Sequence, residues 1–281
     1  MSAITTGTGL GLFNTSWNLL GTAGDPTVGR RGDAVYINSV TGNLIIQRQD
    51  DTLASTGLGL GVVRTYNSQG KLNDDNADNW RLGLYRSLAP VTGSVNTAGS
   101  TLTRTHADGA ETVFTYDTTL SLYRSTDGDG AHDTLAYNAT TLIWTWTDGS
   151  TRTTETYNSL GQLTAVRDTD GNALIYAYTG TLLTSVTDAS GQVTYLDYAG
   201  RNLSQIRTVS QGLTQVRTRY TYDTLNRLVQ VKVDLTPADN SIVDGKAAIF
   251  VANAGCSDKH SINASRLTML TTGTCSDACT S

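Results

Sequence analysis

A motif of about 20 residues recurs through the middle of this 281-residue chain and limits its fold more than any other feature. Tyrosines mark its period, with steps of 21, 20, 21, 20 and 24 residues, at Tyr116, Tyr137, Tyr157, Tyr178, Tyr198 and Tyr222. Two copies also repeat aspartate and glycine 20 positions apart, as Asp168 and Gly171 and then as Asp188 and Gly191. A fixed period in this range indicates stacked repeats, in which each unit buries its apolar face against its neighbours.

Each repeat is predicted to be one β-hairpin. Residues 162–167 and 173–178 are short segments rich in β-branched, aromatic and aliphatic residues, which is typical of strands. The turn between them contains Asp168 and Gly171, and aspartate can bond the turn backbone while glycine supplies a positive φ. The predicted fold class is therefore all-β, with stacked antiparallel hairpins of about 20 residues each that form a curved open sheet.

Two motifs in this chain have a recognisable form. One is the repeat itself, from Tyr157-Asn-Ser-Leu-Gly-Gln-Leu to Asp168-Thr-Asp-Gly171, with a second copy at Arg219-Tyr-Thr-Tyr222-Asp223-Thr-Leu-Asn-Arg227-Leu228. It resembles the YD repeat of RHS (rearrangement hot spot) proteins. The other motif, Gly32–Leu44 followed by Arg64–Ser68, is similar to the module that opens an RHS core. The resemblance covers roughly residues 32 to 235, and it implies a β-strand shell, which in the family often encloses a toxic C-terminal domain.

Changes in composition divide the chain into four predicted segments. Residues 1–29 form a Gly/Thr-rich leader, 30–105 an opening β module, and 106–242 the YD-repeat hairpin array. Residues 243–281 form a tail without the repeat that contains all three cysteines. Two explanations of the tail stay open, a small capping or partner domain and a truncated or frame-shifted reading, and the tail is a candidate for disorder.

The opening module is predicted to contain strands of its own, at 34–38, 44–48, 61–66 and 80–85. Between the second and third lies a glycine-rich stretch that ends at Gly61. A phosphate-binding loop of that composition needs a helix after it. Because a strand follows here, we expect a turn and no phosphate site.

Composition argues against several classes of partner. The net charge is −5, with 20 Lys and Arg against 25 Asp and Glu and no basic patch, so nucleic acid is not an expected partner. No apolar run is long enough for a membrane-spanning helix, and the leader lacks the features of a secretory signal peptide. The resemblance nevertheless implies a secreted or surface location, reached through a dedicated export system or within a larger protein.

Candidate metal ligands are few. Four soft ligands occur as two pairs that could close a zinc site or form a disulfide: Cys256, His260, Cys275 and Cys279. Asp-Gly clusters at 127–130 and 168–171 are similar to calcium loops but lack a bidentate glutamate, so we interpret them as hairpin turns. His106 and His132 neighbour such turns and are expected to be solvated. We predict no metal, cofactor or catalytic residue.

The aromatic residues suggest one candidate binding surface. Pairs two positions apart lie on one face of a strand, and six side chains are placed in this way: Trp144, Trp146, Tyr176, Tyr178, Tyr220 and Tyr222. Their rings could stack against sugars, since YD repeats are associated in the family with carbohydrate binding. Packing inside the sheet is the favoured interpretation, because aromatic rings bury large apolar areas.

Two functions therefore stay under consideration. The first is a non-enzymatic scaffold, the opening segment of a shell whose partners are the remainder of the shell and a toxin cargo. Alone, such a sheet has open edges and is expected to self-associate. The second is a secreted or surface module that binds carbohydrate through its aromatic face.

Overall fold

The protein is described by a computed structural model that covers residues 3–6, 34–38, 44–53, 55, 57–68, 76, 78–125, 132–210, 212–239 and 247–251. Two compact units divide the chain between Thr194 and Tyr195, within strand β16 (Val193–Ala199). Apart from one short 3-10 turn, η2 (Pro237–Asp239), the regular elements of the described residues are strands. The predicted all-β fold is confirmed.

The opening module forms a five-stranded sheet in chain order. Its strands are β1 (Ala3–Thr6), β2 (Ala34–Asn38), β3 (Leu44–Leu53), β4 (Leu60–Asn67) and β5 (Trp80–Leu82). The pair β1–β2 is parallel, and the other pairs are antiparallel. The fourth predicted strand ends earlier than expected, at Leu82, because the guanidinium of Arg81 bonds the carbonyl of Tyr85 and turns the chain.

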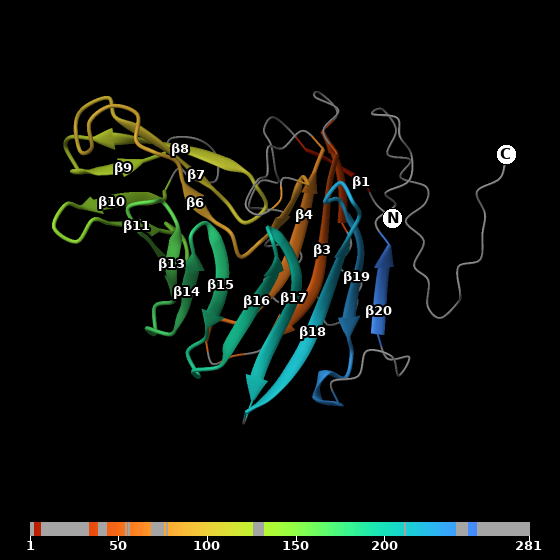
Figure 1. Cartoon of the computed structure of the whole chain (residues 1–281). Coiled ribbons are helices and arrows are strands. Elements are labelled where there is room, and N and C mark those ends of the chain that lie inside the picture. The colour runs from red at the N-terminus through yellow and green to blue at the C-terminus, as the bar shows by residue number, and fades with distance from the viewer. Residues whose placement is uncertain are drawn as a thin grey trace. The chain divides into compact units, whose positions relative to one another are not determined.

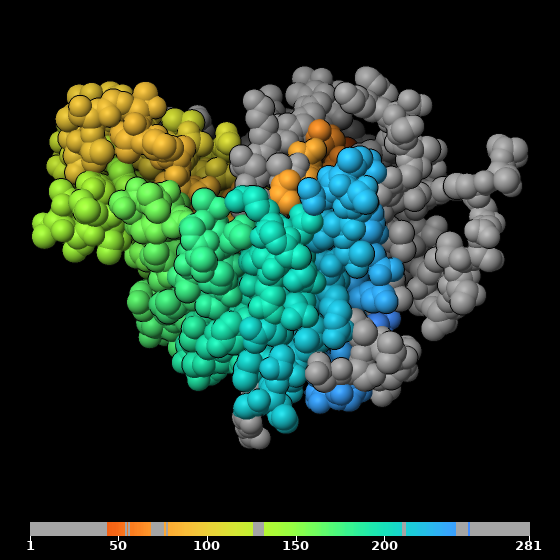
Figure 2. Space-filling model, viewed as in Figure 1, coloured from red at the N-terminus to blue at the C-terminus, as the bar shows by residue number. Residues whose placement is uncertain are grey.

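The repeats of the first unit form a sheet in which each strand pairs with its neighbours along the chain (Figure 1). Its strands are β6 (Ser87–Leu88), β7 (Thr101–Thr105), β8 (Glu111–Asp117), β9 (Leu122–Arg124), β10 (Thr134–Asn138), β11 (Ile143–Thr147), β12 (Thr154–Tyr157), β13 (Leu163–Arg167), β14 (Ala173–Thr179) and β15 (Leu182–Thr187). All of these pairs are antiparallel, as predicted. Figure 2 shows the stretch from β12 to β15, in green, as a continuous surface.

The second unit continues the same hairpin pattern. Its strands are β17 (Asn202–Ser210), β18 (Leu213–Tyr222), β19 (Leu228–Asp234) and β20 (Ala247–Val251), paired antiparallel in chain order. The last of these lies inside the segment predicted as a tail without repeats. The predicted zinc ligands of that tail lie outside the described residues.

Aspartate or asparagine organises the longer turns in one recurring way. The carboxylate of Asp168 accepts bonds from the amides of Asp170 and Asn172, and Gly171 adopts a φ of 87°. Three further turns use the same positions, with the acceptor and the positive-φ residue at Asp188 and Gly191, Asn158 and Gly161, and Asp223 and Asn226. The turn chemistry predicted from the sequence is therefore present, with asparagine able to replace either residue.

A β-bulge recurs immediately before the repeat tyrosine. The register shifts just before Tyr157, Tyr178 and Tyr222, which pair with leucines on the next strand. These partners are Leu163, Leu183 and Leu228. One extra residue on the second strand produces each shift. These three tyrosines therefore lie at equivalent places on their hairpins, whereas Tyr137 pairs with Trp144 without a bulge.

One face of the repeat sheet is buried. Its largest fully buried side chains in the first unit include Phe114, Tyr123, Leu135, Tyr157, Leu163 and Leu183. Residues at alternating positions, such as Val113 and Ile175, are 47% and 42% exposed on the other face. The apolar row that each hairpin contributes is thus buried only when neighbouring hairpins extend it.

Candidate functional site

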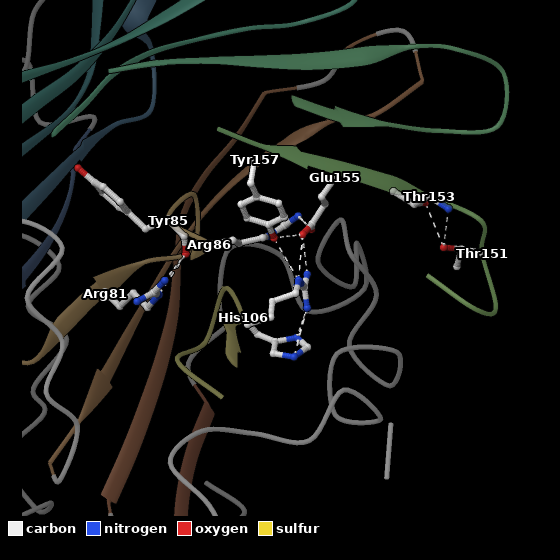
Figure 3. A network of polar contacts seen from close by, with 9 residues as sticks. Arg81, Tyr85, Arg86, His106, Thr151, Thr153, Glu155 and Tyr157 are labelled. Carbon is white, nitrogen blue, oxygen red and sulfur yellow. Dashed lines mark hydrogen bonds and ion pairs between the residues drawn. The ribbon is translucent and has the colours of Figure 1, made fainter. Parts of the chain in front are cut away.

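A cluster of charged and polar side chains interrupts the apolar row of the first unit at β12 (Figure 3). Glu155 lies on the same face of β12 as Tyr157, two residues away, and its side chain is 2% exposed. Arg104 from β7 lies against it, with 4% of its side chain exposed. Because a buried charge is costly unless paired, the partners of these groups decide what the cluster does.

Arg104 is bonded on all sides. Its Nε and NH2 groups donate to Oε2 of Glu155 at 3.1 and 2.7 Å, and Nε also lies 3.1 Å from the Tyr157 hydroxyl. That hydroxyl donates in turn to Glu155. The guanidinium also stacks on the Trp146 ring, 3.8 Å from its centroid, and Trp146 is the cross-strand partner of Glu155. The result is a closed arrangement that joins β7, β11 and β12.

A second arginine reaches Glu155 from residues 81–88, which we call the strap. Arg86 donates from NH1 to Oε1 of Glu155 at 2.5 Å. On one side of it, the hydroxyl of Tyr85 accepts a bond from the amide of Leu183 at 3.0 Å. On the other side, the amide of Leu88 donates to the carbonyl of Gly161 at 2.9 Å. The strap therefore lies across the hairpins from β12 to β15.

Gly161 is required where the strap ends. Its φ is 75°, and a Cβ there would overlap the carbonyl oxygen of Leu88. Larger residues are excluded by conformation and by space together. Since the same turn position is free of neighbours at Gly171, the close approach of the strap is specific to one hairpin.

His106 completes the cluster beside Arg104. Its ring nitrogens lie 2.8 and 3.2 Å from NH1 of Arg104, and Nε2 lies 2.8 Å from the hydroxyl of Thr112. Burial and the charge of Arg104 lower the pKa of His106 from 6.5 to about 3. His106 is half-buried and not solvated as expected, because it follows the end of β7 and bonds Arg104, two residues earlier, and Thr112. His132 is exposed as expected.

The electrostatics hold each group in one protonation state. Burial alone would raise the pKa of Glu155, but the charges of Arg104 and Arg86 outweigh it and lower the pKa to about 2. Burial raises the pKa of Tyr157, which stays a neutral donor. Burial also raises the pKa of Tyr176 on β14 to about 12. None of these groups exchanges a proton near neutral pH, so the chemistry of the cluster is charge pairing and hydrogen bonding.

The predicted aromatic surface is mostly buried. Four of its six side chains are 5–6% exposed: Trp144, Trp146, Tyr176 and Tyr220. Trp144 packs against Tyr123 and Tyr137, with centroids 5.3 and 4.6 Å apart. Tyr178 and Tyr222 are half-buried. The rings of the buried four pack inside the sheet, and glycan stacking stays an untested prediction.

The candidate metal sites have simpler explanations or lie outside the described residues. The carboxylate of Asp168 accepts bonds from its own turn, and three or more His, Cys, Asp or Glu side chains do not gather at a metal-binding distance among the described residues. The Asp-Gly cluster at 127–130 lies outside them. In the part of the chain that the structure describes, no helix has the length and apolar character needed to cross a membrane.

The Arg104–Glu155 cluster lies outside the predicted site residues, although the sequence contains one signal of it. Glu155 is one of two glutamates in the chain and falls two residues before Tyr157, on the face that the repeat buries. A charged residue at an inward position needs a partner of opposite charge. Nothing local indicates which arginine supplies it, because Arg104 and Arg86 lie 51 and 69 residues away.

Comparison with known proteins supports the repeat. The family model named RHS Repeat matches residues 157–193, which include β13, β14, β15 and the start of β16. Among solved structures, the crystal structure of TcdB2-TccC3-Cdc42 is similar over 78% of this chain and 14% of that chain, at 13% identity and a TM-score of 0.28. The search among curated proteins finds no match.

Proposed function

This chain is an RHS-repeat protein, and from that premise we propose that its strands form part of the wall of an RHS shell and have no catalytic role. The observation that carries the proposal is the equivalence of successive hairpins. The hairpins β12–β13 and β14–β15 share the same bulge and the same buried leucine, at Leu163 and Leu183, and the turns after β13 and β15 share the same aspartate bonds. Further hairpins can therefore extend the sheet without a new kind of contact.

The remainder of such a shell and an enclosed toxin are the partners that this role requires. The strap gives the wall a defined beginning, because it fixes the opening module against particular hairpins through Glu155 and Gly161. We place this protein, with its relatives, outside the cell or at its surface. The chain spans 14% of the solved chain to which it is similar. An enclosed toxin is therefore part of what we propose for this protein.

An open sheet edge provides the test. β20 pairs with β19 and is the last strand of its sheet among the described residues. Unpaired strand edges recruit further strands, so the chain should associate reversibly as its concentration rises, measured by sedimentation velocity. A chain that stays monomeric at all concentrations would count against an extendable wall.

A pair of proline variants locates the association. Successive backbone N–H groups of an antiparallel strand point to opposite sides, and proline has no N–H. Of Ala248→Pro and Ile249→Pro, one therefore removes a donor towards β19 and the other a donor towards the open edge. Only the variant that removes the donor towards the open edge should abolish association while the circular dichroism spectrum stays unchanged. Equal association of both variants would place the contact elsewhere.

Carbohydrate binding is the alternative function, and Tyr178 and Tyr222 are the residues that favour it, since both are half-buried. A glycan array followed by titration of tryptophan fluorescence tests it. A sugar that binds should lose affinity in Tyr178→Phe or Tyr222→Phe far less than in the alanine variants, because stacking uses the ring and not the hydroxyl. Absence of binding across common glycans would leave the wall as the supported role.

A further inference from the structure

Strand β6, at the end of the strap, is bonded on both of its sides. On one side it pairs with β7, to which the amide of the next residue, Ala89, also donates. On the other side the amide of Leu88 donates to the carbonyl of Gly161 at 2.9 Å, and Ser87 forms an antiparallel bridge with Gln162. The first strand in the order of the hairpin strands is therefore paired on both sides within its own unit.

Buried contacts hold the strap in this place. The side chain of Leu88 is buried, and Arg86 bonds Glu155, whose side chain is 2% exposed. At its other end the strap is bonded through the hydroxyl of Tyr85 to the amide of Leu183. Another strand could reach the free side of β6 only by displacing these contacts, so this edge of the sheet is closed.

The last strand in the same order, β20, differs from β6. Among the described residues it pairs with β19 and with no other strand. Its five residues are Ala-Ala-Ile-Phe-Val, without the charges or proline by which proteins commonly protect an edge strand. The opening module ends in shorter strands, with three residues in β5 and four in β1, and short edges are poorer templates. We therefore expect added strands at β20.

The difference between the two end strands limits how copies of the chain can meet. A contact between β20 of one copy and β6 of the next would repeat without closing and would build a filament. The closed side of β6 excludes that contact. Two β20 edges can instead meet around a two-fold axis, which uses the same strand of both copies. Because β20 contains no charged residue, no like charges oppose each other in such a pair.

We propose that two copies of this chain pair through their β20 strands, and that assembly stops at two because the strap closes the edge at β6. The inference rests on the proposed wall, in which the next hairpin would occupy the same edge of β20. It gives the wall a direction, since hairpins can be added beyond β20 and not before β6. Five residues form few hydrogen bonds, so the dimer should be reversible.

The limiting mass of the full chain tests this inference. Sedimentation velocity over a series of concentrations should show the mass rising to twice that of the single chain and then staying constant. Growth past two copies would leave the extendable wall in place but overturn the closed edge. A single chain at all concentrations would contradict the wall itself, so the two failures are distinguishable.

A second measurement observes the closed edge directly. The amide of Leu88 points away from β7 and is protected only if Gly161 accepts its bond. Its hydrogen exchange, followed by NMR in the full chain, should therefore be slow. Exchange as fast as that of an unfolded peptide would show that β6 has an open side and would overturn the proposal.

A pair of glycine variants reopens the edge. Gly161→Ala places a methyl group against the carbonyl of Leu88, whereas Gly171→Ala meets no neighbour within 4 Å and is the matched control. Gly161→Ala should lose the protection of the Leu88 amide and assemble past two copies, and Gly171→Ala should keep both the protection and the limit. If Gly161→Ala loses that protection, keeps its circular dichroism spectrum and still stops at two, the strap does not set the limit.

Discussion

The opening module and the hairpins from β12 to β15, both in the first unit, are stabilised by different interactions. The opening module and the β7 hairpin bury many charged side chains: Arg48, Asp50, Asp51, Arg64, Arg81, Arg104 and Asp108. Between residues 154 and 187, Glu155 is the one charged side chain that is buried in the described structure. The hairpins repeat one apolar contact, whereas the opening module depends on unique pairs.

The two kinds of interaction have different roles: one lets the sheet extend, and the other fixes where the strap attaches. Apolar contacts between identical hairpins allow the sheet to grow but do not specify where a strap should attach. A buried ion pair adds little net stability over apolar packing, yet it is costly to break. The pairs of Arg86 and Arg104 with Glu155 therefore distinguish one hairpin from all others, which the repeat alone cannot do.

The largest effect is expected when Glu155 is changed. Glu155→Gln keeps the shape of the side chain but removes the counter-charge of the buried Arg104 and of Arg86. The free energy of unfolding should therefore fall by about 3–5 kcal/mol. The measurement is denaturant unfolding of the full chain. Glu111→Gln, at the other glutamate, is the control, and since that side chain is exposed it should change stability by less than about 0.5 kcal/mol. Similar losses in both variants would show that Glu155 is an ordinary surface acid.

A pH series tests the same cluster through His106. Its pKa is lowered from 6.5 to about 3 in the folded chain, so the unfolded chain binds the extra proton between these values. The contribution of His106 to the free energy of unfolding is therefore fully present above pH 6.5. It falls by at most about 1.4 kcal/mol for each pH unit as the pH decreases towards 3. Below pH 4.5, Glu155 adds to the loss, because its folded pKa is about 2.

Two histidine variants identify the source of that pH dependence. His106→Gln should flatten the stability curve between pH 6.5 and 4.5, the window in which Glu155 does not yet contribute. His132→Gln, at an exposed position, should leave the curve unchanged. If the curve of His106→Gln keeps the slope of the parent chain, another group binds the proton.

The contrast between the two regions also explains what could be predicted from the sequence. The hairpins were predictable because their turn residues and apolar positions recur at a fixed distance, as at Asp168 and Asp188. Each recurrence is decided by local chemistry, an aspartate that bonds its turn and a residue with positive φ. The order of strands then follows, since sequential hairpins pair with their neighbours.

The strap could not be predicted in this way. Arg86 and Glu155 are 69 residues apart, and neither lies in a motif that names the other. The early end of β5 was also missed because it depends on a single interaction. Arg81 bonds the carbonyl of Tyr85, four residues ahead, although the apolar pattern of the strand continues. Interactions that occur once leave no period in a sequence. The inward position of Glu155 was the one local sign that such an interaction existed.

A pair of glycine variants tests whether the strap is specific to one turn. Gly161→Ala places a methyl group against the Leu88 carbonyl and also requires a φ of 75°, so it should cost about 2–3 kcal/mol. Gly171→Ala meets nothing within 4 Å at a φ of 87° and should cost only about 1–2 kcal/mol of backbone strain. Both are measured by thermal or denaturant unfolding. Equal costs would mean that the strap yields at Leu88.

The smallest effect concerns the hydroxyls that support the bulges. Thr164 and Thr184, 20 residues apart, donate to the carbonyls of Thr156 and Ala177, each just before a repeat tyrosine. Ser204, a further 20 residues on, makes the same bond to the carbonyl of Asp197, whereas the extra residue at the bulge between β18 and β19 is Val229, which has no hydroxyl. Thr164→Val and Thr184→Val should each lower the free energy of unfolding by about 1 kcal/mol, the net value of one such bond.

The reverse substitution makes this test sharper. Val229→Thr supplies the missing hydroxyl at a half-buried position, where it can donate to the carbonyl of Thr221, the residue before Tyr222. If the hairpins are equivalent, as the wall requires, this variant should gain up to about 1 kcal/mol. A loss in Val229→Thr together with losses in both valine variants would show that each bulge is adapted to its own surroundings. The repeat would then be shared by the backbone and not by the interactions that stabilise it.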